Sequence, residues 1–312
     1  MNSGPGGIRT LDFPVTAGLK AVKSRVLLAA SAPTRLSHGP ERIYRPPKLS
    51  VYDTMFVFIG LGLHGEGMSL RGLREAQESD VVYAELYTSM LPKLRLDELE
   101  QTIGRPIKVV DRETVEQRPD EILQAAKTRK VAFLVPGDPM VATTHVDLRL
   151  RATKVGIETK IIHAASIASA AAGLAGLQSY KFGRSATVPF PDNPSQVPYE
   201  TLVENRGRGI HTLLLLDIRA KEGRAMLASE AIEIMLGLEK KLQKNAFTPD
   251  TLVVVVARAG SDEAIVKADK VRRLQKLDFG SPPHVLIVPG KLHFVEAEAL
   301  RAFAGAPEDV IK

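Results

Sequence analysis

From Met55 onward, short apolar runs alternate with segments of helical pattern, and this alternation constrains the fold more than any other feature of the chain. Such an alternation is typical of α/β proteins, in which helices cover largely parallel sheets. Strands are predicted in two series, at 55–61, 80–84, 106–110, 130–135 and 157–162, and then near 184–190, 211–218, 251–257 and 284–288. Helices are predicted between them, at 69–79, 94–103, 119–128 and 144–155, and then near 225–244, 269–277 and 293–303.

The two series are separated by the stretch "GLQSYKFGRS". The chain has 312 residues, 44% of them apolar, which is enough for two cores of ordinary size. We therefore expect two α/β domains, residues 55–175 and 176–312, joined near 172–184.

The net charge of +6 is carried almost entirely by the first 54 residues. They hold eight Lys and Arg against three Asp and Glu, whereas residues 55–312 hold 34 basic and 33 acidic side chains. The part expected to fold therefore lacks the basic surplus typical of direct nucleic-acid binding. Residues 1–54 are rich in Pro, Gly and Ser, and we predict that they are disordered or come from a misplaced start codon upstream of Met55. An Arg-rich transit peptide is the alternative interpretation.

The chain contains no Cys, which excludes disulfides and thiolate chemistry and favours a cytoplasmic location. No apolar stretch approaches the roughly 20 residues that a membrane helix requires. We therefore expect a protein that works without a membrane.

The first predicted strand leads into "GLGLHGEGMS", in which Gly60, Gly62 and Gly65 match the pattern GxGxxG. Glu85 follows twenty residues after Gly65, so the spacing is that of a dinucleotide-binding fingerprint. That fingerprint requires a helix N-terminus within the glycine turn, whereas Ser69 is the predicted N-cap of the next helix. A nicotinamide or flavin site remains the less favoured interpretation.

The stretch "VPGDPMVATTH", residues 135–145, ends the apolar strand "KVAFLV" with an acid between Gly137 and Pro139. Ligands of open parallel sheets collect at the carboxyl ends of strands, which makes this loop a candidate site. The stretch contains no Lys or Arg, so a neutral or cationic ligand suits it better than a phosphate. Capping of the next helix by Asp138 is the structural alternative.

Seven stretches of the chain resemble one family closely and in the right order over residues 55–307. They are "FIGLGL", "VVYAELYTS", "VAFLVPGDPMVATTH", "IIHAASIASAAAGLAGLQSYKFG", "HTLLLLDI", "VVVVARAG" and "PPHVLIVPGKLHFVEAEAL". The chain thereby resembles the diphthine synthases, which are methyltransferases of the tetrapyrrole methylase class of folds. Residues 1–54 have no counterpart in that family.

The resemblance implies two αβα domains of the tetrapyrrole methylase type, with S-adenosyl-L-methionine bound in a cleft between them, and a homodimer. Residues carried over as cofactor contacts come from both halves of the chain: Leu63, Asp138, Val141, Ser166, Ile167, Leu216, Ala259 and His284. The strand before "PGDP" would then end where it does because its tip forms a wall of the cofactor site.

The family's reaction is successive methylation of the amino group on a 3-amino-3-carboxypropyl histidine of translation elongation factor 2, with S-adenosyl-L-homocysteine as the product. Displacement at a sulfonium methyl by a neutral amine depends mainly on alignment, which is worth on the order of 7–11 kcal/mol. No side chain is marked by its spacing as a general base, so the catalytic residues stay unassigned. A methylase acting on a tetrapyrrole macrocycle and a binding-only protein of translation are the alternatives.

Six histidines lie in the part expected to fold, but they show neither HExxH nor another short ligand spacing, so no metal site is predicted. His284 differs from the other histidines, because the resemblance places it against the cofactor, where it would stack on adenine or hydrogen-bond to it. The small apolar run "SIASAAAGLAGL" is too short to span a bilayer and is predicted to be a buried helix that Ser166 caps.

Overall fold

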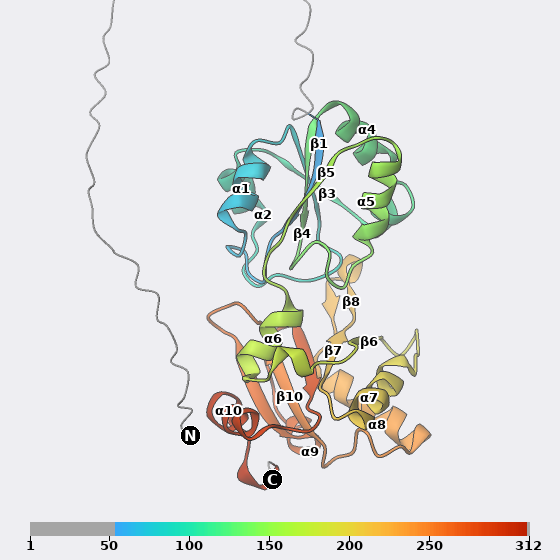
Figure 1. Cartoon of the computed structure of the whole chain (residues 1–312), viewed down its shortest axis with the longest axis vertical. Helices are drawn as coiled ribbons and strands as arrows, with labels where there is room; N and C mark the ends of the chain where they lie inside the picture. The colour runs from blue at the N-terminus through green and yellow to red at the C-terminus, as the bar shows by residue number, and fades with distance from the viewer. Residues whose placement is uncertain (1–53, 311–312) are drawn as a thin grey trace, which may run out of the picture. The chain divides into compact units, whose positions relative to one another are not determined.

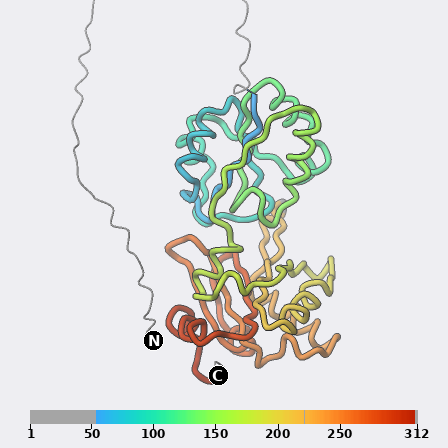
Figure 2. Tube along the Cα trace, in the orientation of Figure 1, coloured from blue at the N-terminus to red at the C-terminus, as the bar shows by residue number. Residues whose placement is uncertain are grey.

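The structure is a computed structural model that describes residues 54–310, all within one compact unit. The predictions of a disordered or mis-annotated extension, or of a transit peptide, over residues 1–54 fall outside the described residues, apart from Thr54. Two five-stranded sheets are built from successive parts of the chain, as the colours of Figure 2 show.

The first sheet is entirely parallel, as predicted, with strand order β3-β2-β4-β1-β5. Its strands are β1 (Met55–Gly60), β2 (Val81–Glu85), β3 (Ile107–Val110), β4 (Lys130–Val135) and β5 (Thr159–Ile162). The helices are α1 (Leu70–Gln77), α2 (Leu96–Ile103), α3 (Arg112–Glu116), α4 (Asp120–Thr128) and α5 (His145–Lys154). The short helix α3 was not predicted.

Both faces of the first sheet are covered by helices (Figure 1). Successive β1 side chains point to opposite faces, so Phe56 and Phe58 pack with α3, α4 and α5, while Val57 and Ile59 pack with α1 and α2. All four are fully buried, and burying each such side chain contributes about 1.5–3 kcal/mol. A strand buried on both sides explains why "MFVFIG" is continuously apolar.

The second sheet has the order β11-β10-β12-β7-β6. Its strands are β6 (Ala186–Val188), β7 (Thr212–Leu216), β10 (Leu252–Ala257), β11 (Ile265–Lys270) and β12 (His284–Val288). Only β6 and β7 pair in parallel, and the other three pairings are antiparallel. The expectation of largely parallel sheets is therefore wrong for this half of the chain.

One of the three antiparallel pairings is made by β11, which was not predicted. Residues 265–270 pair with all of β10, from Ile265 opposite Ala257 to Lys270 opposite Leu252. Antiparallel neighbours need only a short connection, here residues 258–264, which leaves no room for a crossover helix. The helix predicted over 269–277 shortens to α9 (Val271–Leu274).

Helices also cover both faces of the second sheet (Figure 1). One face packs on α6 (Ile167–Ala175) and α10 (Phe294–Ala304), and the other on α7 (Val197–Gly207), α8 (Ala228–Leu242) and α9. Helix α7 was not predicted, nor was the hairpin of β8 (Ile218–Arg219) and β9 (Arg224–Ala225). Three 3₁₀ turns complete the described elements, at Ser179–Lys181, Ala220–Glu222 and Glu308–Val310.

Helix α6 begins as predicted, because the Ser166 side chain accepts a hydrogen bond from Ala168 N. Helix α6 packs on the second sheet. Judged by these contacts, the chain passes from the first sheet to the second before Ser166 and not at residue 175. The division into domains at 175 stays a prediction. Among the described helices, none combines the length and apolar character needed to cross a membrane.

Candidate functional site

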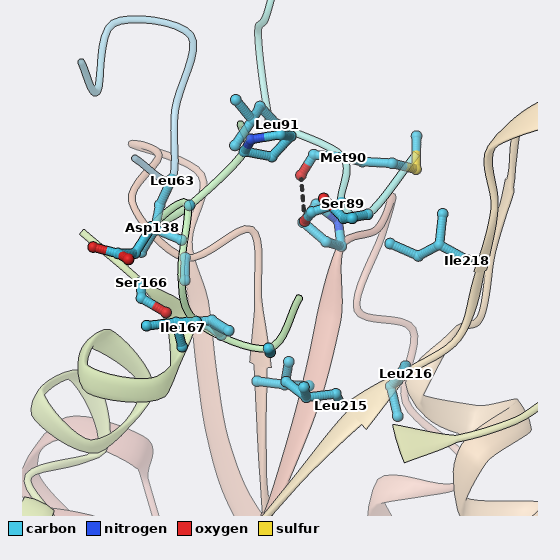
Figure 3. Close-up of a pocket in the computed structure, with 18 of the residues that line it drawn as sticks. Leu63, Ser89, Met90, Leu91, Asp138, Ser166, Ile167, Leu215, Leu216 and Ile218 are labelled. Atoms are coloured by element: carbon cyan, nitrogen blue, oxygen red, sulfur yellow. Dashed lines mark hydrogen bonds between the residues drawn. The ribbon is translucent and has the colours of Figure 1, made fainter. Parts of the chain in front are cut away.

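A cavity of about 890 Å³, its open mouth included, is lined by loops of the first sheet and by strand ends of the second (Figure 3). Its walls contain all eight residues predicted as cofactor contacts, namely Leu63, Asp138, Val141, Ser166, Ile167, Leu216, Ala259 and His284. The structure thus brings the predicted residues together, and their contact with a cofactor remains a proposal.

The loop after β4 forms a large part of the wall on the first-sheet side. Its backbone is fixed by a reciprocal pair of hydrogen bonds between Gly62 and Gly137, at 2.8 and 3.1 Å. Asp138 is 6% exposed and lies beside Leu63 in Figure 3. Its carboxylate accepts hydrogen bonds from Met140 N (2.9 Å), Ala164 N (3.3 Å) and His163 Nδ1 (2.8 Å). Asp138 therefore joins the loop after β4 to the loop after β5.

The glycines of the GxGxxG pattern are explained by other segments of the chain that approach them closely, and not by binding of a pyrophosphate. A Cβ on Gly60 would lie 2.6 Å from both Ala164 Cβ and Gly137 O, and one on Gly65 would lie 2.6 Å from Lys93 O. Helix α1 begins only at Leu70, with the Ser69 side chain accepting from Gly72 N. The glycine turn consequently has no helix N-terminus for a phosphate, which speaks against a dinucleotide site.

On the second-sheet side, buried Arg258 holds the loops around Ala259. Its guanidinium donates to the carbonyls of Glu263 (3.1 Å), Phe279 and Ser281 (both 2.6 Å). The neighbouring Gly260 has φ +87°, and a Cβ there would lie 2.7 Å from Leu63 Cβ. A glycine at this position lets the two sides of the cavity come into contact.

His284 lies in the cavity wall with both ring nitrogens already used by the protein. Nδ1 accepts from Ala228 N at 3.1 Å, and Nε2 donates to Ser281 O at 3.1 Å. Burial lowers the pKa of the imidazole, which agrees with a neutral ring. Of the two predicted roles, stacking on a ligand fits these contacts and hydrogen bonding to it does not.

Sequence reasoning missed the turn after β2, where Thr88, Ser89, Met90 and Leu91 line the cavity. The turn is organised by Glu85, whose buried carboxylate accepts from Tyr87 N and Thr88 N (both 3.1 Å) and from the Thr88 hydroxyl (2.5 Å). The Glu85 carboxylate therefore binds groups of its own turn, and it does not face a ribose as the acid of a dinucleotide-binding site would. A hydroxyl three residues after an acid at a strand end, within "VVYAELYTS", was the available signal.

The chemistry of the cavity wall suits an uncharged or cationic ligand with a large apolar part. Among the described residues that line it there is no Lys or Arg, while Asp138 supplies a carboxylate. Within residues 54–310, no group of three or more His, Cys, Asp and Glu side chains is placed to hold a metal ion.

Comparison with known proteins agrees with this architecture. Residues 55–275 match the family model of the tetrapyrrole (corrin/porphyrin) methylases. The diphthine synthase of Methanocella arvoryzae is 49% identical over 255 residues, which is 80% of this chain and 98% of that protein. The diphthine synthase of Methanosarcina acetivorans is 48% identical over 83% of this chain and 99% of its own length.

Solved structures give the same result. A crystal structure of a diphthine synthase aligns with a TM-score of 0.76 and 41% identity, covering 82% of this chain and 98% of that one. A putative diphthine synthase from Entamoeba histolytica aligns with a TM-score of 0.74 and 37% identity, over 81% of this chain and all of that one. The chain is therefore a methyltransferase that belongs to the tetrapyrrole methylase family and, within it, to the diphthine synthases.

Proposed function

We propose that the chain transfers methyl groups from S-adenosyl-L-methionine to the amino group of a 3-amino-3-carboxypropyl histidine on translation elongation factor 2. S-adenosyl-L-homocysteine is the second product. The proposal rests on membership in the diphthine synthases and on one structural observation. All eight residues expected to contact the cofactor line one cavity, although they come from segments up to 221 positions apart, from Leu63 to His284.

The chemistry of the walls supports this donor. S-adenosyl-L-methionine supplies a methyl group on a positively charged sulfur and carries no phosphate, so a cavity without basic lining residues suits it. The apolar side chains of Ile167, Leu216 and Ala259 would pack on the adenosine part. Val141 and Leu63 would close the opposite side.

What the protein supplies to the reaction is mainly alignment. Ser166 and Asp138 lie at fixed loop ends, and the contact of Gly260 with Leu63 holds the two sides of the cavity at a constant spacing. Holding donor and amine in line reduces the activation free energy by on the order of 7–11 kcal/mol in well-oriented cases.

We further propose a cytoplasmic homodimer, as the family resemblance implies. Helix α10 exposes Phe294 and Phe303, at 71% and 65%, which gives it an apolar surface of the kind that a second copy would cover. Light scattering on the full chain measures the assembly directly. A monomer at micromolar concentration would reject the dimer without affecting the proposed reaction.

The decisive experiment mixes the protein with S-adenosyl-L-methionine labelled in the methyl group and with elongation factor 2. Label should appear on the factor that carries the 3-amino-3-carboxypropyl group and not on the unmodified factor. A corrinoid precursor as acceptor tests the macrocycle alternative, and S-adenosyl-L-homocysteine formation separates an enzyme from a binding-only protein. Label on the corrinoid alone, or no turnover with the modified factor, would contradict the proposal.

A further inference from the structure

The turn after β2 connects the cavity to a carboxylate buried beneath it. Thr88 lines the cavity, and its hydroxyl donates to Glu85 Oε1 at 2.5 Å. The side chain of Glu85 is fully buried. One hydroxyl therefore stands between the space where the reaction would take place and a proton acceptor that water does not reach.

A second buried group completes this arrangement. His145, at the start of α5, donates from Nδ1 to Pro139 O at 3.2 Å, which leaves Nε2 as an acceptor. Nε2 has no hydrogen-bond partner and lies 3.7 Å from Glu85 Oε1. A buried polar atom without a partner is rare, and here it faces the carboxyl oxygen that accepts the Thr88 hydroxyl. A proton that arrives on Glu85 thus lies beside an unused acceptor.

The surroundings favour proton uptake by Glu85. Burial raises the pKa of its carboxyl to about 7, even though the hydrogen bonds from Thr88 and Tyr87 and the field of Arg112 act in the opposite direction. Burial also lowers the pKa of His145, so no cation forms beside the carboxylate at neutral pH. The other charged groups facing this cluster, Asp111 and Glu116, belong to the α3 segment and act on Tyr87, with Glu116 acting on His145 too.

We propose, on the basis of the proposed function, that Thr88 and Glu85 form a proton relay for the incoming amine. An N–H bond of the substrate ammonium breaks and its proton binds to Thr88 Oγ1, while the Thr88 hydroxyl proton passes to Glu85 Oε1. The freed nitrogen lone pair forms the bond to the methyl carbon, and the electron pair of the breaking carbon–sulfur bond stays on sulfur. After product release the carboxylic acid passes its proton back to Thr88 Oγ1, while the Thr88 hydroxyl proton passes to water in the open cavity.

The reaction requires a group that accepts a proton from the amine. Aliphatic ammonium groups have a pKa near 10, so at neutral pH the amine arrives protonated and cannot attack. A general base works best when its pKa lies near the working pH. Asp138, the carboxylate that lines the cavity itself, is assigned to the cofactor in the proposed function, so it is not assigned to the amine. Thr88 touches the amine and is catalytic in this scheme, whereas Glu85 acts through it.

The test measures single-turnover methylation of modified elongation factor 2 at saturating S-adenosyl-L-methionine from pH 6 to 9. Four variants are compared with the wild type: Glu85→Gln, Thr88→Val, Thr88→Ser and the control Glu113→Gln. Glu113 is an exposed α3 carboxylate paired with Arg118, outside the relay. Calorimetry of S-adenosyl-L-methionine binding on each variant verifies that the cavity is intact.

At pH 7 we expect Glu85→Gln and Thr88→Val to be roughly 10²–10⁴-fold slower than the wild type. The ratio of the wild-type rate to the rate of either variant should fall about tenfold per pH unit towards pH 9, because solvent then deprotonates the amine without a base. Thr88→Ser should restore the wild-type pH profile, and Glu113→Gln should match the wild type.

Two outcomes overturn the relay while leaving the proposed function intact. One is a loss of methylation rate in Glu85→Gln that has the same size at every pH, which would indicate that Glu85 has a purely structural role. The other is Thr88→Val with the wild-type profile. A wild-type chain that fails to methylate the modified factor at any pH would reject the proposed function, and the relay with it.

Discussion

Two glutamates of this chain are fully buried and face a buried histidine, yet their surroundings push their proton affinities in opposite directions. Glu85 lies in the first sheet beside His145, and its pKa is raised to about 7. Glu296 lies in the second-sheet region beside His211, at 2.9 Å, and its pKa is lowered to about 2. Neither side chain is exposed to solvent, but Glu85 lies deeper in the protein, and Glu296 has a cation among its donors, so depth and donors both contribute to the difference.

Burial alone would raise the pKa of Glu296 as well, but its donors outweigh burial. They are the backbone N–H groups of His293 (2.8 Å) and Gln178 (2.9 Å), His211 Nε2 and the ammonium of Lys181. These partners belong to "LQSYKFG", "HTLLLLDI" and "PGKLH", which are parts of three stretches that carry the family resemblance. One part of each stretch therefore meets at this ion pair, while Ser166, Leu216 and His284, from the same stretches, line the cavity.

The comparison shows why one carboxylate is structural and the other is available for proton transfer. A buried charge with a cation and several donors is held ionised across the physiological range. A buried carboxylate that makes no ion pair with Lys or Arg, as at Glu85, is expected to change its charge near neutral pH. The following predictions test that contrast, from the largest expected effect to the smallest.

Glu296→Gln should destabilise the protein most, because it leaves the Lys181 ammonium and His211 without their acceptor. Breaking a buried ion pair by removing one partner costs about 3–5 kcal/mol. Urea unfolding at pH 7 measures the loss. The control is Glu298→Gln, an exposed carboxylate on the same helix, which should leave stability near the wild-type value.

The pH dependence of the wild type follows from the same contact. Because the pKa of Glu296 is lower in the folded than in the unfolded chain, its contribution is complete above pH 4.5 and is lost as pH falls towards 2. In Glu296→Gln this part of the acid unfolding should disappear. An unchanged acid limb in the variant would contradict the assignment.

Asp138→Ala should weaken S-adenosyl-L-methionine binding and also lower stability. The predicted loss of a hydrogen bond to a charged group corresponds to about 10- to 150-fold in affinity. Since Asp138 also joins two loops through Met140 N and Ala164 N, we expect a loss of about 1–3 kcal/mol in unfolding free energy.

Calorimetry and urea unfolding measure the two effects of Asp138→Ala separately. Asp147→Ala is the matched control, because Asp147 is an exposed α5 carboxylate that pairs with Arg151. Affinity equal to that of the wild type would remove Asp138 from the cofactor site. Unchanged stability would show that its loop contacts contribute little.

Glu85→Gln should change stability with the opposite sign to that of Glu296→Gln. A folded pKa above the unfolded value means that the wild type loses stability as pH rises from 4.5 through 7. The variant lacks this loss, so its stability relative to the wild type should increase between pH 5 and pH 8. A relative stability that falls over this interval would mean that the buried carboxylate is stabilised as an anion.

Much of the first sheet could be predicted from sequence. The strand predicted at 55–61 is observed at 55–60, and Ser69 and Ser166 cap their helices as expected. Parallel strands buried on both faces give continuous apolar runs, and N-caps depend on local contacts, so both can be recognised within a short window. The second sheet could not be predicted to the same degree, because β11 is an edge strand whose pairing with β10 is set by the whole sheet.

The candidate site could also be predicted only in part. Its eight predicted residues came from the resemblance, and the structure collects them in one cavity. Glu85 was noticed for its spacing from the glycine loop, but spacing does not show that its side chain points inward to Thr88 and His145. Contacts between β2, α5 and the loop after β4 create this cluster, and they exist only in the folded chain.

The most direct test of the contrast is a ¹³C NMR titration of the glutamate side-chain carboxyls, with signals assigned from the Glu85→Gln and Glu296→Gln spectra. We predict that Glu85 titrates near pH 7 while Glu296 stays ionised until the pH approaches 2. A Glu85 carboxyl already ionised at pH 5 would contradict the account and leave the proposed relay without its proton acceptor.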